Sequence, residues 1–290
     1  MANVAVVGTA AADVVLRVPA VPQRGEHVSG SSLGWRLGGG SANVAVALAA
    51  DGHHVELIGP FSTDDMGQAL LSELGSRGVG TSRSFRVAAP SPRALILLDA
   101  GGERTIVGVD EAFSKDVYPL TELPALQSLG GLDAVYVETY HRFPPAIVRA
   151  GPDTVLVTSP PSGNERPWPA DILVGSEHDY PVTWQAAPYE HARNVAGPRL
   201  QWVIVTRGAR GADAYGPSGR VHVDAVPMDQ VDATGAGDAF AAGLLSAVLA
   251  GEPIEEALDH GARRAASAVA SLESIAPAMT EALGITWPGR

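Results

Sequence analysis

Short runs of β-branched residues alternate along this chain with longer Ala- and Leu-rich segments of helical pattern. The first run, NVAVVG at 3–8, is followed by the helical pattern SANVAVALAADG at 41–52. Further strand-length runs are AVYVE at 134–138, TVLVT at 154–158, DILVG at 171–175 and WVIVT at 202–206. Strands that alternate with helices pair mostly in parallel and are covered on both faces. We therefore expect an α/β fold with a mostly parallel sheet flanked by helices.

Two stretches break this alternation, at residues 14–36 and 84–109. Both contain short alternating strands, prolines and turn glycines with no helix between them. They predict a small antiparallel sheet outside the main one, which would act as a lid. Because an isolated small sheet is rarely stable in water, the lid should close on a substrate or pair with a second copy in a homodimer. No repeat or linker is present, so residues 1–290 should form one domain with this lid.

Composition and charge narrow the possible partners. The 290 residues carry a formal net charge of −12, which argues against binding to nucleic acid or to an anionic membrane. The absence of cysteine excludes disulfides, thiolate catalysis and cysteine-ligated zinc. The first residues lack a signal-peptide pattern, and the longest apolar run, at 239–251, is shorter than the ~20 residues that span a bilayer. We therefore expect a cytoplasmic protein without a membrane segment.

The segment DATGAGDAF at 232–240 lies between a strand-like stretch at 221–231 and a helical pattern. In an open α/β sheet, ligands bind where strands give way to helices. The Gly-Ala-Gly run would leave backbone amides open at a helix N-terminus, which favours phosphate. A carboxylate beside them, that of Asp238, can deprotonate a hydroxyl while the amides stabilise a transferring phosphoryl group. A tight turn followed by an ordinary first-turn Asp is the alternative.

A second glycine-rich segment, at 38–40, follows the first predicted strand. Three glycines let the backbone approach a ligand, and Asn43 offers both a donor and an acceptor to a polyhydroxyl compound. Ser41 is a plausible N-cap of the following helix. Asp13, just past the first strand, suits acceptance from two sugar hydroxyls. A mere loop with a solvated Asp is the alternative interpretation.

Taken together, these segments resemble the PfkB carbohydrate kinase family, which has a ribokinase-like fold. GGGSANVA at 38–45 resembles the amino-terminal signature of the family, and DATGAGDAFAAG at 232–243 resembles its carboxy-terminal signature. Three intermediate stretches also match: residues 58–79, which include Asp64; GGERTIV at 101–107, a lid strand; and TRGARGA at 206–212, a nucleotide-binding turn. The resemblance covers almost the whole chain.

The resemblance implies an ATP-dependent kinase that phosphorylates a hydroxyl of a sugar, or of a sugar-containing molecule such as a nucleoside, with Mg²⁺ between the phosphates. Asp238 becomes the base, and the anion hole is formed by the amides of Gly235, Ala236 and Gly237. The implied sugar contacts are Asp13, Gly39, Gly40, Asn43 and Glu138. The implied ATP contacts are Ser176, Thr206, Gly208 and Gly211. Asp232 and Thr234 match the region where some members bind a monovalent cation such as K⁺.

The chain departs from the family at two places. Members usually carry Asn-x-x-Glu, which organises the magnesium and water network, where this chain has Ser176-Glu177-His178-Asp179, so Asp179 keeps one carboxylate at the motif position. Members often carry Asp-Pro-Asn where this chain has Ser-Pro-Pro at 159–161. The rival hypothesis is therefore a catalytically weak sugar- or nucleotide-binding protein that retains the kinase fold. The intact Asp238 favours the enzyme. No P-loop and no H-E-x-x-H zinc motif is present.

Overall fold

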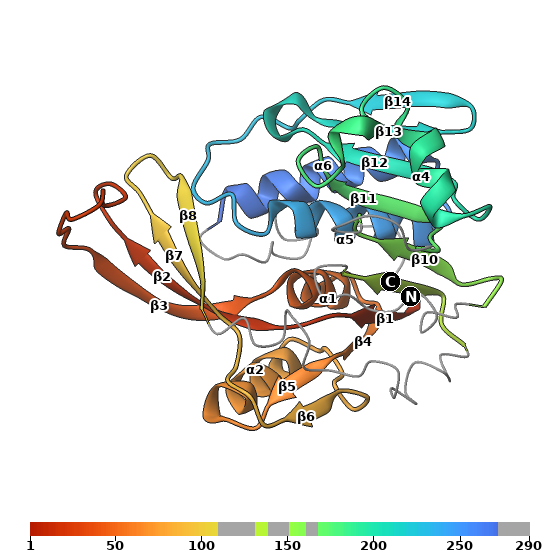
Figure 1. The fold of residues 1–290 in the computed structure, drawn as a ribbon. Coiled ribbons are helices and arrows are strands. Elements are labelled where there is room, and N and C mark those ends of the chain that lie inside the picture. Colours follow the sequence, from red (N-terminus) through yellow and green to blue (C-terminus); the bar gives the residue numbers. More distant parts are fainter. Residues whose placement is uncertain (110–130, 139–150, 161–167, 272–290) are drawn as a thin grey trace.

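The computed structural model describes residues 1–109, 131–138, 151–160 and 168–271, and its largest element is an eight-stranded sheet (Figure 1). The strand order is β14-β13-β12-β11-β10-β9-β1-β4. The strands are β1 (Asn3–Val7), β4 (His54–Ile58), β9 (Ala134–Val137), β10 (Val155–Thr158), β11 (Ile172–Ser176), β12 (Trp202–Thr206), β13 (Ala212–Gly216) and β14 (Gly219–Val223). All pairs from β12 to β4 are parallel, and β13 and β14 form an antiparallel edge. The predicted mostly parallel sheet is confirmed.

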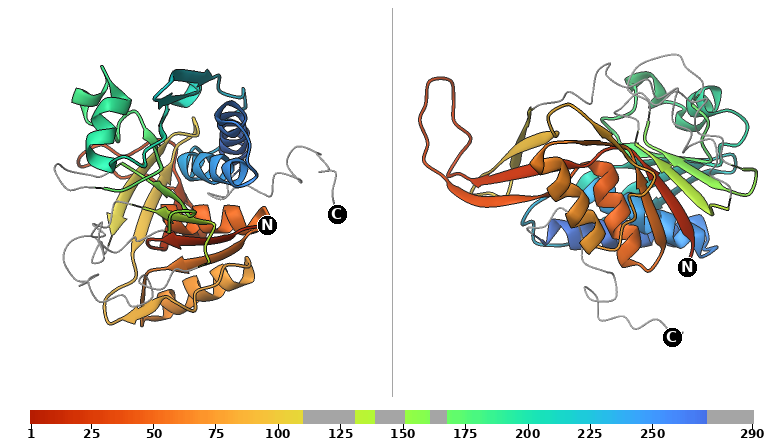
Figure 2. Two further views of the ribbon diagram at one scale, coloured as in Figure 1. Left: turned by 90° about the vertical axis from the view of Figure 1, so that its right-hand side faces the viewer. Right: turned by 90° about the horizontal axis from the view of Figure 1, so that it is seen from below.

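Helices cover both faces of this sheet (Figures 1 and 2). They are α1 (Gly40–Ala50), α2 (Asp65–Ser76), α4 (Pro188–Ala196), α5 (Ala236–Leu249) and α6 (Ile254–Val269), with short 3-10 turns η5 (Val182–Trp184) and η6 (Gly208–Arg210). Because side chains alternate along a strand, Val4 and Val6 face the core shared with α1, α5 and α6. Ala5 and Val7 face the core shared with α4. Within the described ranges, no helix is long and apolar enough to cross a membrane.

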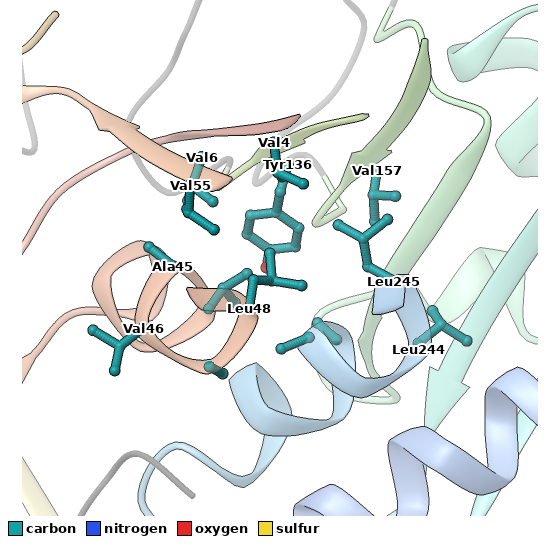
Figure 3. Close-up of a cluster of buried hydrophobic side chains, with 14 of the residues drawn as sticks. Val4, Val6, Ala45, Val46, Leu48, Val55, Tyr136, Val157, Leu244 and Leu245 are labelled. Atoms are coloured by element: carbon teal, nitrogen blue, oxygen red, sulfur yellow. The ribbon is translucent and has the colours of Figure 1, made fainter. Parts of the chain in front are cut away.

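Helix α1 is largely buried, because it packs against both the sheet and α5. All residues from Ser41 to Leu48 are buried. Figure 3 shows Tyr136 of β9, Leu48 of α1 and Leu245 of α5 pointing toward one another in this core. This packing fixes α1 and α5 side by side on the sheet.

A buried ion pair links the three helices α1, α5 and α6. The side chain of Arg264 in α6 is 0% exposed and pairs with Asp51 at the C-terminal end of α1. Arg264 also donates to the carbonyl oxygen of Ala47 at 2.8 Å. Ser246 of α5 donates to the same Asp51 carboxylate at 2.7 Å. One carboxylate therefore holds all three helices.

A second sheet projects from the main body at the predicted positions (Figures 1 and 2). Its order is β3-β2-β7-β8, with β2 (Ala11–Arg17), β3 (Ser31–Gly38), β7 (Arg93–Leu98) and β8 (Arg104–Val109). The outer pairs are antiparallel as predicted, but the central pair β2–β7 is parallel. The reason is topological: the chain passes through α1, β4 and α2 between β3 and β7, so β7 is not the return strand of a hairpin with β2.

Other details of the sequence interpretation need correction. Within the predicted 84–109 stretch, β6 (Phe85–Val87) pairs with β5 (Pro60–Ser62) in a separate two-stranded sheet. The predicted strand at 221–231 ends at Val223, and α5 begins only at Ala236. Because β14 is the outer edge of the sheet and α5 starts beside α1, residues 224–235 must cross the sheet before the helix begins. Pro161, named among the departures from the family, lies outside the described residues.

Candidate active site

Two carboxylates meet the N-terminal end of α1, and the first is Glu138, which directly follows β9. Its carboxylate accepts hydrogen bonds from the Ser41 amide at 3.0 Å and from the Ser41 hydroxyl at 2.5 Å. Burial raises the pKa of Glu138, and the two hydrogen bonds from Ser41 partly oppose the rise. The predicted N-cap role of Ser41 is wrong, because Gly39 is the N-cap and Ser41 already lies inside the helix. The Ser41 side chain donates a hydrogen bond to the Glu138 carboxylate instead.

The second carboxylate is Asp238, in the first turn of α5. Asn43 of α1 donates to Asp238 Oδ2 at 2.7 Å. Burial raises the pKa of Asp238 to about 7; the hydrogen bond from Asn43 and the charge of Arg104 oppose this rise, and the nearby Glu138 adds to it. Asn43 is 5% exposed, and its Oδ1 atom is buried without a hydrogen-bond partner among the described residues.

Gly40 separates these two carboxylates. A Cβ atom at this position would lie 2.6 Å from Glu138 Oε1 and 3.0 Å from Asp238 Oδ1. Gly39, with φ 90°, makes the turn from β3 into α1, and a Cβ there would lie 2.9 Å from the Thr9 carbonyl oxygen. The close approach of backbone expected for this glycine-rich segment is therefore present, and it brings Glu138 and Asp238 to one place.

The N-terminus of α5 provides the predicted amides. Its N-cap Gly235 has φ 77°, a left-handed conformation that suits glycine. The Ala236 amide makes a long bond of 3.4 Å to the Ala233 carbonyl, whereas the Gly235 and Gly237 amides meet no acceptor in the described part of the chain. A Cβ atom at Gly237 would meet nothing within 4 Å, so this helix end is open toward the space beside Asp238.

Asp13 lies on β2 in the second sheet, rather than just past the first strand as the sequence indicated. It is 5% exposed, and its carboxylate lies against Gly38, where a Cβ would be 2.2 Å from Oδ1. Burial raises the pKa of Asp13 to about 6; Arg36 lowers it, and the nearby charge of Asp238 raises it further. The structure therefore brings Asp13 into the same electrostatic environment as Asp238.

Asp232 and Thr234 lie just before α5 and are bound to each other. Asp232 Oδ1 accepts from the Thr234 amide at 2.8 Å and from the Thr234 hydroxyl at 2.6 Å. Asp232 Oδ2 accepts from the Arg36 guanidinium at 2.8 Å. Arg36 comes from β3, two residues before Gly38, so this contact joins the second sheet to the segment that leads into α5.

The predicted nucleotide contacts lie at the ends of two neighbouring strands. Ser176 and Thr206 are paired in register at the ends of β11 and β12. Gly211, with φ 80°, closes the turn after β12, and a Cβ there would lie 2.0 Å from the Val223 carbonyl oxygen. Gly208 has φ 57° and open space around its Cβ position. Within the described ranges, no hydrogen bond joins these four residues to Asp238 or to its partner Asn43.

Asp179, the predicted metal ligand, is bound to Ser176, the other residue that departs from the family pattern. Asp179 Oδ2 accepts from the Ser176 amide at 2.7 Å and from the Ser176 hydroxyl at 2.8 Å. These bonds close the turn after β11. In the described ranges, no three His, Cys, Asp or Glu side chains come together as a metal cage. The two altered residues thus form one local unit.

A model of the family described as pfkB family carbohydrate kinase matches residues 1–281 of this chain. The chain belongs to this family. The family predicted from the two glycine-rich signatures is therefore confirmed, and so is the enzyme class, a carbohydrate kinase with an alcohol group as phosphoryl acceptor.

Similar proteins cover nearly the whole of this carbohydrate kinase. It is 29% identical over 281 residues to the ribokinase of Bacillus subtilis. This alignment covers 93% of this chain and 94% of that protein. It is 29% identical over 259 residues to an ATP-dependent ribose-1-phosphate kinase of Halopiger xanaduensis, spanning 86% and 85%. The structure of Arabidopsis thaliana ribokinase complexed with ribose and ATP superposes with a TM-score of 0.76 at 21% identity, covering 98% of each chain, and confirms the ribokinase-like fold.

Several residues that shape this site were not found from the sequence. Gly8 directly follows β1, and a Cβ there would lie 1.7 Å from the Ser41 hydroxyl, so glycine lets α1 approach the strand end. Arg36, which binds Asp232, was also missed, whereas Gly38, which makes room for Asp13, belongs to the glycine-rich segment that the sequence indicated. The glycine at the end of the first strand was a usable signal. The contact between Arg36 and Asp232 gave no such signal, because the two residues lie far apart in the sequence.

Proposed function

We propose that this carbohydrate kinase transfers the γ-phosphoryl group of ATP to a hydroxyl of a sugar or a sugar-containing molecule, with Asp238 as the general base. The environment of Asp238 is the observation that carries this proposal. Its pKa is raised to about 7, and it lies beside the open amides of Gly235 and Gly237. A base whose pKa is near the working pH accepts a proton efficiently while still being ionised. The amides stabilise the negative charge of the phosphoryl group in transfer.

The acceptors around Asp238 fit a polyhydroxyl substrate. Asn43 Oδ1 is buried without a donor, and Asp13 and Glu138 present further carboxylate oxygens close by. A buried acceptor without a donor costs free energy, which a sugar hydroxyl would recover by donating to it. We therefore assign sugar contacts to Asp13, Asn43 and Glu138, with Gly39 and Gly40 letting the sugar approach the backbone.

ATP is assigned to the edge formed by Ser176, Thr206, Gly208 and Gly211. A Cβ at Gly208 would meet nothing within 4 Å, so the turn after β12 leaves space beside it for a nucleotide. Mg²⁺, when bound with ATP, would neutralise charge on the phosphates. Asp179 offers one carboxylate at this edge, and its bonds to Ser176 leave most of the metal coordination to phosphate oxygens and water, an arrangement that Mg²⁺ accepts.

The proposal is tested by ADP release with ATP and Mg²⁺ across a panel of pentoses, hexoses, sugar phosphates and nucleosides. Ribose and ribose 1-phosphate come first, because similar proteins are named as kinases of ribose and of ribose 1-phosphate. We expect ADP formation that requires one of these acceptors. If no acceptor supports ADP formation at any Mg²⁺ concentration, while a sugar or ATP still binds by calorimetry, the alternative of a binding protein with a kinase fold replaces the proposal.

The pair Ser176 and Asp179 predicts a weakened apparent affinity of the wild-type protein for Mg²⁺. Restoring the family residues with Ser176→Asn and Asp179→Glu should lower the Mg²⁺ concentration for half-maximal rate, with little change in the sugar KM, because a longer carboxylate reaches further toward the phosphates. Titration of the initial rate with Mg²⁺ measures this. Asp224→Glu, at a side chain that is 99% exposed, is the matched control. An unchanged Mg²⁺ titration in the double variant would mean that other groups organise the metal.

We also propose a homodimer formed through the second sheet. The strand registers align Trp35, Val14, Leu95 and Val107 in one row across all four strands, on the face opposite Asp13. Trp35 is 43% and Val107 46% exposed, so this outer apolar row offers a surface for a second copy. Sedimentation velocity should show a dimer that Trp35→Glu converts to a monomer, whereas Val182→Glu on η5 should have no effect. A monomeric wild-type protein at working concentration contradicts this proposal.

A further inference from the structure

Both oxygens of the Asp232 carboxylate accept hydrogen bonds from protein groups. Thr234 donates twice to one oxygen, and Arg36 donates to the other. The Asp232 side chain is 1% exposed and that of Arg36 is 16% exposed, so this ion pair is shielded from water. Burial alone would raise the pKa of Asp232, but the bonds from Thr234 and Arg36 lower it. Asp232 therefore stays ionised, and its charge is balanced by a guanidinium that never loses its proton.

This arrangement does not fit the monovalent cation that the family resemblance implies at Asp232 and Thr234. A cation bound to the Asp232 carboxylate would lie beside the Arg36 guanidinium and would compete with it for the same oxygen. In a shielded site, two such like charges repel strongly. The cation and the observed ion pair are therefore alternatives for the same carboxylate.

We infer that the guanidinium of Arg36 takes the place of a monovalent cation at Asp232, so that phosphoryl transfer by this chain does not depend on K⁺. This inference rests on the proposed function and names a feature of the same site. Arg36 acts through Asp232, which begins the segment leading to the Gly235–Gly237 amides, and is thus a positioning residue. In the β2–β3 register Arg36 also lies opposite Asp13, so one side chain connects the sugar side of the site to the anion hole. β3 continues directly into α1, which carries Asn43 (Figure 1).

The test measures initial rates of acceptor-dependent ADP formation in chloride salts of K⁺, Na⁺ and tetramethylammonium at one ionic strength. For the wild type we expect rates within about twofold of one another in all three salts, because no cation site is coupled to the reaction. Activation by K⁺ of about tenfold or more over tetramethylammonium in the wild type would overturn the inference. The proposed kinase function would survive that result, because acceptor-dependent turnover is itself observed.

Three variants test whether Arg36 replaces a bound cation or only supports the fold. Arg36→Gln removes the charge, and its activity should fall in tetramethylammonium and recover by about fivefold or more in K⁺. Arg36→Lys keeps a charge and should stay independent of K⁺. Arg17→Gln, at an exposed end of β2, should behave as the wild type in every salt. If Arg36→Gln is equally impaired in all three salts, Arg36 is a structural support only and the inference is wrong.

Thermal unfolding provides a readout that needs no turnover. The wild type should show the same Tm in K⁺ and in tetramethylammonium, whereas Arg36→Gln should be stabilised by K⁺, because a cation that binds only the folded state raises its stability. A specific rise in wild-type Tm with K⁺ would contradict the inference. If no acceptor supports turnover in any salt, the proposed function fails, and the Tm comparison still decides the cation question. If Arg36→Gln does not fold, the wild-type and Arg36→Lys measurements decide it.

Discussion

Replacing Asp238 by Asn is expected to lower kcat by about 10²-fold or more, because a positioned general base contributes a factor of this size. The amide is nearly isosteric and keeps a contact with Asn43, but it cannot accept the proton of the sugar hydroxyl. The affinity for ATP should change little, because the proposed nucleotide contacts lie at the ends of β11 and β12. Steady-state kinetics with the best acceptor, together with calorimetric titration of ATP, measure both quantities.

Asp229→Asn is the matched control for this prediction. Asp229 is an exposed carboxylate in the same connection between β14 and α5, so its neutralisation removes one negative charge without touching the site. We expect kcat within about twofold of wild type, since a distant exposed charge interacts weakly in water. Equal kcat values for Asp238→Asn and Asp229→Asn would remove Asp238 from the chemical step.

Replacing Arg264 by Met is expected to lower the free energy of unfolding by about 3–5 kcal/mol, the usual cost of breaking a buried ion pair from one side. Met retains most of the apolar stem, so the loss reports the charge rather than a cavity. The Asp51 carboxylate would lose its guanidinium partner, and the Ala47 carbonyl would lose a donor. Urea-induced unfolding followed by fluorescence measures the change.

The neighbouring residue in the same helix supplies the comparison. Arg263 pairs with Asp259 one turn away, with both side chains largely exposed at 45% and 39%. Arg263→Met should therefore cost at most about 0.5 kcal/mol. Adding Asp51→Asn to Arg264→Met should recover part of the loss, since no unpaired buried charge then remains. A small and equal loss in Arg263→Met and Arg264→Met would show that the buried pair does not hold the three helices together.

The main sheet was predictable because its central strands β1, β9, β10 and β12 are mostly apolar and a clear helical pattern, that of α1, precedes β4. Such local patterns determine which segments form strands and helices. Because parallel strands all end at the same edge of the sheet, they also determine where the loops that follow the strands lie. Asn43 and Asp238 were found for this reason, since both follow a glycine-rich segment at the start of a helix. The family resemblance added the residues at 176–211, where local pattern alone indicated only a turn.

The remaining features depend on contacts between distant segments. Nothing near Ser41 in the sequence indicates that it binds Glu138 rather than caps its own helix. The parallel β2–β7 pair follows from the path of the whole intervening chain. Arg36 meets Asp232 only because β3 and the segment before α5 converge in space. Such ion pairs between distant residues leave no periodic or local signal in a single sequence.

The pH dependence of kcat/KM for the wild type is the measurement that tests the central claim most directly, because this parameter reports the ionisation of groups in the free enzyme. A general base acts only when ionised, and burial raises the pKa of Asp238 to about 7. We therefore expect kcat/KM to be constant above that pH and to fall as the pH decreases through about 7, and further below about 6, where Asp13 also gains a proton. The limb near 7 should be absent from the residual activity of Asp238→Asn. A kcat/KM that stays constant down to pH ~5.5, or the same limb in Asp238→Asn, would contradict Asp238 as the base.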